Sequence, residues 1–364
     1  MASEYEVSGV PFLRSLNVRT HRIDLTNVMF ISEEFHAKLR KSALRPGDVV
    51  TVRTGKPGVT AVIPESLPRA NCSDLVITRP GPELDSVWLS YFINGAASGY
   101  VASRLVGAVQ QHFNVSSAKE LRLLLPPLEE QRAIAATLGA LDNKIESNRN
   151  LTQTAAALVR ALYTEAAAGR DRGPFRDAMT VSMGTPFKGA HYTEPGIGRP
   201  LLRIRDLKTF VPQTWTTEQR HDESVIEPGS IVVGMDAEFR ATIWLGDSAV
   251  LNQRVCAFRP LAPVGRAFAL HSLEADLALQ ERAKSGTTVI HLNKADIQRF
   301  RVPIFSHDEH RALAAMTDPL IDMIVARSAE SKHLARMRDA LMPELLSGRL
   351  RANDVSESRF GGTV

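Results

Sequence analysis

Cysteine is scarce in this chain, which has only Cys72 and Cys256 among its 364 residues. Two cysteines in different halves of the chain argue against a disulfide scaffold or a thiolate zinc site and fit a reducing cytoplasm. The first ten residues, MASEYEVSGV, lack the basic and then apolar pattern of a signal peptide, and no apolar run approaches membrane-spanning length. We therefore expect a soluble, cytoplasmic protein with no membrane partner.

Motifs of known catalytic sites are also absent. The sequence has no glycine-rich S-adenosylmethionine loop, no (N/D)PP(Y/F) tetrad and no GxxxxGK[ST] loop, and TGKPG at residues 54–58 has the wrong spacing for a phosphate loop. The ten histidines form no ligand set, and no Ser-His-Asp or Cys-His arrangement is recognisable. We therefore predict no catalytic residue, no metal site and no cofactor bound by this chain.

Neither sign of charge predominates strongly. The chain has 44 Lys+Arg and 40 Asp+Glu, a formal charge of +4, with 44% hydrophobic residues. This balance is compatible with a polyanionic partner but does not require one. The length leaves room for two ordinary domains and connecting helices.

What the sequence does contain is an internal repeat. Residues 121–151 read as a proline-marked strand end followed by a long amphipathic helix, and residues 299–334 follow the same pattern. The correspondence pairs Arg132 with Arg311, Leu141 with Leu320 and Ile145 with Ile324. Two copies of a globular unit followed by a helix predict a pseudo-two-fold protein that binds a two-fold or bipartite partner.

The repeat extends upstream into the globular parts. GVPFLRSLNV (residues 9–18) matches GRPLLRIRDL (198–207), and RPGDVV (45–50) matches EPGSIVV (227–233). Short β-type runs such as VVTVR, VTAVI and IVVGM are separated by turn residues and interrupted by a helical patch at residues 87–105. The predicted fold class is therefore mixed α/β (α+β), with two tandem units.

Each unit is followed by a predicted long helix. Residues 128–168 contain no proline and are rich in strong helix formers, and about 40 helical residues would span about 60 Å. The second helix begins with a capping box at Ser306-His307-Asp308-Glu309 and runs to about residue 347. Pro319 and Pro343 lie within it, so we expect kinks or breaks there.

Apolar residues in both helices recur in steps of three and four, which favours an antiparallel coiled coil between them. The alternative is that each helix packs only on its own globular unit. The predicted helix-pairing residues are Ile134, Leu138, Leu141, Ile145 and Leu162 in the first helix and Leu313, Leu320, Ile324, Leu334 and Leu341 in the second.

These motifs resemble the specificity (S) subunits of type I restriction–modification systems. LPPLEEQRAIAATLGALDNKIESNRNL, beginning at Leu125, is similar to the first conserved helical region of that family, and LARMRDALMPELLSGRLR, beginning at Leu334, to its closing segment. GTPFKGAHY…GIGRPLLRIRDLK followed by PGSIVVGM resembles the start of a target recognition domain. The resemblance covers nearly the whole chain.

The resemblance implies a domain order. The sequence departs from that order in two ways. The first copy lacks about 15–20 residues of the lead-in that the second copy has, and in the second copy VPIFSHDEH replaces the PPLEEQ signature. The expected domains are a first target recognition domain (1–125, with a short lead-in), a first helical spacer (126–170), a second recognition domain (174–303), a second spacer (304–350) and a flexible tail (351–364).

The resemblance also implies a function. The chain would be a non-catalytic subunit that binds double-stranded DNA at a bipartite sequence and docks two methyltransferase (M) subunits and, through them, restriction (R) subunits. S-adenosylmethionine, Mg and ATP are expected only on those partners. One alternative is a coiled-coil adaptor that binds proteins only, and another is a self-sufficient DNA methyltransferase.

DNA contacts are expected from polar loops between strands, where arginine can pair with guanine and glutamine with adenine while other cations meet phosphates. In the first unit the candidates are Arg53, Thr54, Lys56, Gln110 and Gln111. In the second they are Lys188, Arg203, Arg205, Glu238, Arg240, Asn252, Gln253, Arg254, Lys284 and Thr287.

Overall fold

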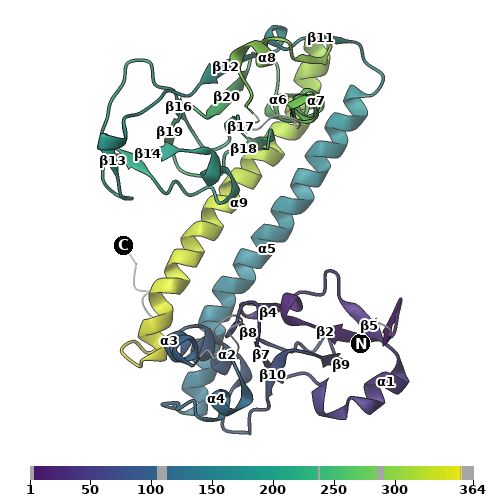
Figure 1. The fold of residues 1–364 in the computed structure, drawn as a ribbon, viewed down its shortest axis with the longest axis vertical. Coiled ribbons are helices and arrows are strands. Elements are labelled where there is room, and N and C mark those ends of the chain that lie inside the picture. Colours follow the sequence, from purple (N-terminus) through teal and green to yellow (C-terminus); the bar gives the residue numbers. More distant parts are fainter. Residues whose placement is uncertain (1–3, 105–112, 237, 285–290, 353, 355–364) are drawn as a thin grey trace, which may run out of the picture. The chain divides into compact units, whose positions relative to one another are not determined.

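The computed structural model describes residues 4–104, 113–236, 238–284, 291–352 and 354. The chain folds into two compact units (Figure 1). The first unit is drawn from residues 1–143 and 334–364, and the second from residues 144–333. Each long helix therefore contributes one end to each unit.

The strands of the first unit form two main sheets and a hairpin. The five-stranded sheet has the order β1 (Tyr5–Glu6), β5 (Met29–Ile31), β2 (Val10–Leu13), β9 (Ala70–Cys72) and β6 (Ala43–Leu44). The three-stranded sheet has the order β10 (Leu75–Thr78), β7 (Val49–Val52) and β8 (Thr60–Val62), and the hairpin joins β3 (Val18–Arg19) to β4 (Arg22–Ile23). The short helices are α1 (Glu33–Lys38), α2 (Ser86–Asn94), α3 (Ser98–Ser103) and α4 (Val115–Lys119).

The second unit has two sheets of the same kind. The five-stranded sheet has the order β13 (Tyr192–Thr193), β15 (Trp215–Thr216), β14 (Arg199–Leu202), β19 (Ala249–Leu251) and β16 (Val225–Ile226). The four-stranded sheet has the order β12 (Met179–Met183), β20 (Val255–Pro260), β17 (Ile231–Gly234) and β18 (Ala241–Ile243), and β11 (Arg172–Pro174) pairs with β21 (Arg301–Pro303). The short helices are α6 (Arg266–His271), α7 (Glu274–Lys284) and α8 (Lys294–Gln298).

The two units repeat one strand topology. In both five-stranded sheets the third and fourth strands run parallel, β2 with β9 and β14 with β19. In the other sheet β7 lies between β10 and β8, as β17 lies between β20 and β18. β12 adds a fourth strand in the second unit, whereas no strand of the described residues pairs with that side of β10. The internal repeat seen in the sequence is therefore a repeat of structure.

Burial explains why the central strands of both units read as continuous apolar runs. Every residue of β7 and of β17 is buried, which is the pattern of strands covered on both faces. One core cluster of the first unit contains Val50 and Val52 of β7, and one of the second contains Ile231 and Val233 of β17. The predicted mixed α/β class with two tandem units and paired long helices is confirmed.

The two long helices are α5 (Leu128–Ala167) and α9 (His307–Leu346), each of 40 residues. α5 carries Glu129 and Glu130 in its first turn, where the helix dipole favours anions. At the start of α9 the Ser306 backbone N–H donates to Glu309 Oε2 (2.7 Å) and the Glu309 N–H to Ser306 Oγ (3.3 Å), so the predicted capping box forms. Hydrogen bonds from Arg170 and Ser306 lower the pKa of Glu309 to about 2.

Of the kinks or breaks expected at the prolines of α9, the breaks are wrong. The helix continues through Pro319 and Pro343 without interruption. Both prolines are exposed, so water can hydrate the carbonyls that lose their N–H partners there. The neighbouring buried residues Leu313 and Ile321 hold this part of the helix against the second unit.

Polar contacts show that α5 and α9 pack antiparallel within each unit. In the first unit Arg338 donates to Asp142 Oδ1 (2.6 Å). In the second, Asn148 donates to Glu330 Oε2 (3.0 Å), and Arg170, just beyond α5, donates to Glu309 Oε1 (2.7 Å). Residues later in α5 thus contact residues earlier in α9, which is the antiparallel arrangement. Asn148 is 2% exposed, and a single buried polar side chain of this kind can fix the register of paired helices.

The apolar stripes of these helices contact the globular parts as well as each other. Ile134 and Leu138 share a cluster with Trp88 of α2. Val159 and Ile321, which the sequence pattern did not include, are buried with Ala267 of α6. Among the predicted pairing residues, Ile134, Leu138, Leu141, Leu313 and Ile324 are buried, whereas Ile145, Leu162, Leu320, Leu334 and Leu341 are half-buried.

In the first unit a histidine at the tip of the β3–β4 hairpin connects the globular part to both helices. His21 stacks on Tyr91 with ring centroids 3.9 Å apart. Tyr91 donates to Asp142 Oδ2 (2.5 Å), whose other oxygen accepts from Arg338. Asn94 Nδ2 and Ser90 Oγ lie 3.2 Å and 3.3 Å from His21 Nδ1. Burial lowers the pKa of His21 to about 4, opposed by Asp142 and assisted by Arg338.

We expect this histidine to make the first unit sensitive to acid. Its pKa is lower in the folded than in the unfolded chain, so its contribution is complete above about pH 6.5 and is lost as the pH falls toward 4. The free energy of unfolding of the first unit should fall by about 2–3 kcal/mol. Hydrogen exchange of α2 peptides between pH 7 and pH 4.5, corrected for intrinsic rates, measures it. His21→Gln should flatten the profile, with β17 of the second unit as the internal reference; an equally steep α2 profile in the variant would contradict the assignment.

Candidate nucleic-acid interface

The second unit has a charged cavity at the end of its four-stranded sheet. Its volume is about 710 Å³, and it lies between the 3₁₀ helix η6 (Ile204–Lys208) and the turn that joins β17 to β18. The side chains that line it are Ile204, Arg205, Leu207, Lys208, Asp236, Glu238, Arg240, Ala241 and Thr242. Three predicted DNA-binding residues, Arg205, Glu238 and Arg240, are therefore brought together here.

A buried aspartate sets the position of η6. Asp206 is 1% exposed, and its Oδ2 accepts from the Arg203 backbone N–H (3.0 Å) while its Oδ1 accepts from that of Gln213 (3.3 Å). In the first unit Asn17 occupies the equivalent place in η2 (Ser15–Asn17) and accepts from the Arg14 N–H (3.0 Å). The same local structure is thus built twice with different acceptors.

A glycine allows η6 to lie close to the sheet. A Cβ on Gly234 of β17 would come 2.9 Å from Ile204 Cγ1 and 3.1 Å from Leu207 Cδ1. A larger residue would therefore displace the side chains of Ile204 and Leu207. Gly234 thus allows the close packing of η6 on β17 beside the cavity.

Cations outnumber acids around this cavity. Arg205 donates to Thr214 Oγ1 (2.8 Å), which orients its guanidinium. Lys208 and Glu238 form an exposed ion pair at 3.6 Å, a contact of the kind that contributes little to stability. Arg240 is exposed, and no described carboxylate pairs with it. Arg240 is thus free to donate to a base edge or a phosphate.

Asp236 organises the neighbouring part of the site. It forms an ion pair with Arg254 (3.4 Å), and its Oδ1 lies 2.7 Å from His291 Nδ1. Arg254 also contacts the His291 ring, with 2.9 Å from its Nη1 to Nδ1. Arg254 is therefore held in place by groups of this chain, whereas Gln253 beside it is exposed.

The remaining described candidates of the second unit lie elsewhere or are covered. Lys188 is exposed, and its backbone N–H donates to Glu218 Oε2 (2.7 Å). Arg203 lies over the ring of Tyr192, 5.9 Å from its centroid. Asn252 is only 6% exposed and its backbone joins β14 to the turn before β20, so its side chain is not presented as a surface reader.

In the first unit the loop between β7 and β8 carries Arg53, Thr54 and Lys56. Lys56 is exposed and Thr54 half-buried. Arg53 is half-buried, and its Nε has no hydrogen-bond partner among the described residues although that atom is buried. An unsatisfied guanidinium nitrogen is uncommon in a folded protein. Gln110, Gln111 and Thr287 lie outside the described residues, as does the side chain of Lys284, the last residue of α7.

Lys208, Asp236 and His291 were missed as site residues by the sequence reasoning. Lys208 is the last residue of the motif GIGRPLLRIRDLK, and its positive charge could have marked it as a candidate. Asp236 and His291 are far apart in the chain and meet through an isolated β-bridge. No spacing in the sequence could have paired them.

The described residues contain no group of three or more His, Cys, Asp or Glu placed to hold a metal ion. Within the same residues, none of the helices combines the length and apolar character that crossing a bilayer requires.

Comparison with known proteins shows what this chain is similar to. Residues 32–156 match a family model described as Type I restriction modification DNA specificity domain. The chain is 30% identical over 179 residues to the Type I restriction enzyme EcoBI specificity subunit of Escherichia coli, a match that covers 48% of this chain and 38% of that protein. The chain thus aligns with well under half the length of that relative.

Two further comparisons extend along the chain. The Putative type I restriction enzyme MjaX specificity subunit of Methanocaldococcus jannaschii is 21% identical over 94% of this chain and 88% of its own length. The crystal structure of a Type-I restriction-modification system S subunit from M. genitalium has a TM-score of 0.64 at 15% identity, covering 95% of this chain and 91% of that one. This structural likeness establishes the fold.

Residues 32–156 are therefore similar to a DNA specificity domain, and the chain is similar to specificity subunits of type I restriction enzymes, which confirms the resemblance predicted from the sequence. These relatives are named as specificity subunits.

Proposed function

We propose that this chain recognises a bipartite DNA sequence, with each unit reading one half. The observation that carries the proposal is the repeated strand order. The family model of a DNA specificity domain covers residues 32–156, and the second unit repeats the order of the first in both main sheets. A second copy of a DNA-reading fold in one chain is best explained by a second half-site.

The charged cavity of the second unit supports this role. It combines two arginines, Arg205 and Arg240, with the acceptor Glu238 and the cation Lys208. Arginine forms bidentate hydrogen bonds with guanine, glutamate accepts from cytosine N4, and lysine neutralises phosphates. In the first unit we assign the same role to the loop with Arg53, Thr54 and Lys56.

We further propose that α5 and α9 set the spacing between half-sites and dock two methyltransferase subunits, through which restriction subunits join. S-adenosylmethionine, Mg and ATP would be bound by those partners. This role is supported by the length of the helices, 40 residues each, about 60 Å. The antiparallel pairing through Asn148 and Glu330 gives them a defined register.

The test is co-expression with the adenine methyltransferase subunit from the same genome, followed by purification and sequencing of methylated DNA. A complex with two methyltransferase subunits per chain and a split methylated motif that disappears without this chain is the expected result. A stable complex that leaves methylation unchanged would instead favour the alternative, an adaptor that binds proteins only. S-adenosylmethionine binding by the isolated chain would favour a self-sufficient methyltransferase.

A further inference from the structure

In the first unit a buried carboxylate at the start of β7 pairs with an arginine that follows β10. Asp48 is 2% exposed. Its Oδ1 lies 3.3 Å from Arg79 Nε, and its Oδ2 accepts from the Arg45 backbone N–H (3.1 Å). Arg79 follows β10, and it also donates to the Ala43 carbonyl oxygen (2.8 Å). Asp48 Oδ1 also lies 3.6 Å from Arg45 Nε, so the carboxylate is shared by two arginines, and Arg79 has a charged partner inside its own unit.

The second unit builds the same turn without the carboxylate. Ser230 stands where the first unit has Asp48, and its Oγ accepts from the Glu227 backbone N–H (3.2 Å), as Asp48 accepts from that of Arg45. The strand registers agree, because β7 pairs Val49 with Thr78 and β17 pairs Ile231 with Phe258. One step further along each pair, Arg259 thus corresponds to Arg79.

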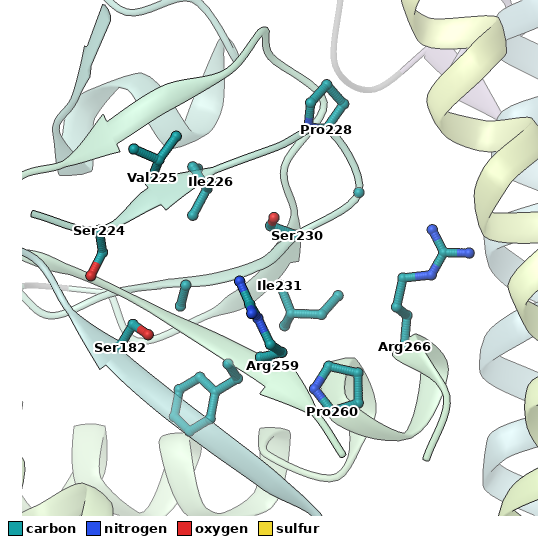
Figure 2. A pocket seen from close by; sticks show the side chains of 13 residues that line it. Ser182, Ser224, Val225, Ile226, Pro228, Ser230, Ile231, Arg259, Pro260 and Arg266 are labelled. Atoms are coloured by element: carbon teal, nitrogen blue, oxygen red, sulfur yellow. The ribbon is translucent and has the colours of Figure 1, made fainter. Parts of the chain in front are cut away.

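Without that carboxylate, Arg259 faces a pocket. The pocket has a volume of about 280 Å³ and includes Ser182, Ser224 and Ser230 in its lining. Figure 2 shows Arg259 extending from β20 into this space, while Arg266 points toward the long helices. Arg266 is already paired with Asp318 (3.5 Å) and Asp322 (2.8 Å) of α9. No described carboxylate pairs with Arg259, and none lines the pocket.

We propose that this pocket binds a tetrahedral oxyanion of the phosphate type, with Arg259 as the charged donor and the Ser182 and Ser230 hydroxyls as neutral donors. Arg259 is exposed and borders a concave site, where an arginine can pair strongly with phosphate. A pocket this small accommodates one such group. The first unit has no equivalent site because Asp48 satisfies Arg79.

The phosphate could come from the DNA backbone or from a free phosphate or nucleotide. The pocket includes Ser230 and Ile231 at the start of β17, whereas the charged cavity includes Asp236 beyond its end. A strand of this length separates them by about 13 Å. This proposal holds whether or not the charged cavity reads bases, so the two can fail separately.

The experiment titrates the full-length chain with inorganic phosphate by calorimetry at constant ionic strength, the remainder being chloride. We expect saturable binding by the unaltered chain. Arg259→Ala should raise the phosphate Kd by about tenfold or more, since it removes a charge-assisted contact. Ser230→Asp should do the same, because it supplies the carboxylate that the first unit has. Arg79→Ala is the matched control, with a phosphate Kd unchanged within about twofold.

DNA binding measured between 50 and 200 mM salt identifies the source of the phosphate. If the pocket takes a backbone phosphate, Arg259→Ala should reduce the slope of log K against log salt by about 0.9. If it takes a free phosphate, the slope stays constant while phosphate binding is lost. The proposal is overturned if the unaltered chain does not bind phosphate and the slope is unchanged, or if Arg259→Ala and Ser230→Asp bind phosphate as the unaltered chain does. Melting curves of each variant verify folding.

Discussion

Removal of residues 149–152 from α5 together with residues 327–330 from α9 is expected to move methylation to a target with a shorter spacer. Both segments lie within the second unit, where Asn148 contacts Glu330 and Ser331. Losing four residues shortens each helix by about 6 Å and turns it by about 40° beyond a full turn. At 3.4 Å per base pair, the spacer should shorten by about two base pairs.

The deletion is paired because the helices are antiparallel partners. Shortening one alone would shift every contact between them by one turn, whereas the paired deletion leaves Asn148 opposite Ser331 (3.3 Å in the intact chain). The original split motif should lose methylation almost completely, and both half-sites should reappear unchanged at the new spacing. Alanine at all eight positions, with the length kept, is the control. Methylation that persists at the original spacing in the deletion would contradict the role of the helices as spacers.

Arg240→Ala is expected to abolish discrimination at one position of the half-site read by the second unit. Arg240 lines the charged cavity, is exposed, and has no carboxylate partner among the described residues. Loss of one bidentate base contact costs about 1–3 kcal/mol, roughly 5- to 150-fold in Kd. Methylome sequencing should show a relaxed base at that position, with the other half-site unaffected.

Lys208→Ala is the matched control from the opposite wall of the same cavity. Lys208 is an exposed point charge, and among the described residues it pairs with Glu238 at the surface. If it contacts a phosphate, its loss should weaken binding to all sequences alike and lower the salt slope by about one. If Arg240→Ala also weakened all sequences equally, Arg240 would be a phosphate contact, and the assignment of base reading to it would be wrong.

The long helices and the repeat could be predicted from the sequence because their signals are local. Helix formers free of proline and a regular apolar stripe predicted α5 between residues 128 and 168, and the structure has Leu128–Ala167. The break predicted at Pro319 was wrong, since the cost of a proline depends on whether its neighbours are solvated. Val159 and Ile321 were missed because α6 packs on one side of the helices, which a two-helix pattern does not include.

By itself, the sequence determined the mixed α/β architecture of two units with long helices. Its repeat and its helical spacing lie along contiguous stretches, and these suffice to indicate two mixed α/β units followed by long helices. Only the tertiary structure decided which charges act together. Strand pairing brings Asp48 to Arg79 but Ser230 to Arg259, and the sheet edge gathers Arg205, Lys208 and Arg240. These partners are distant in the chain, so burial and strand register, rather than spacing, decide whether an arginine is neutralised or free to bind.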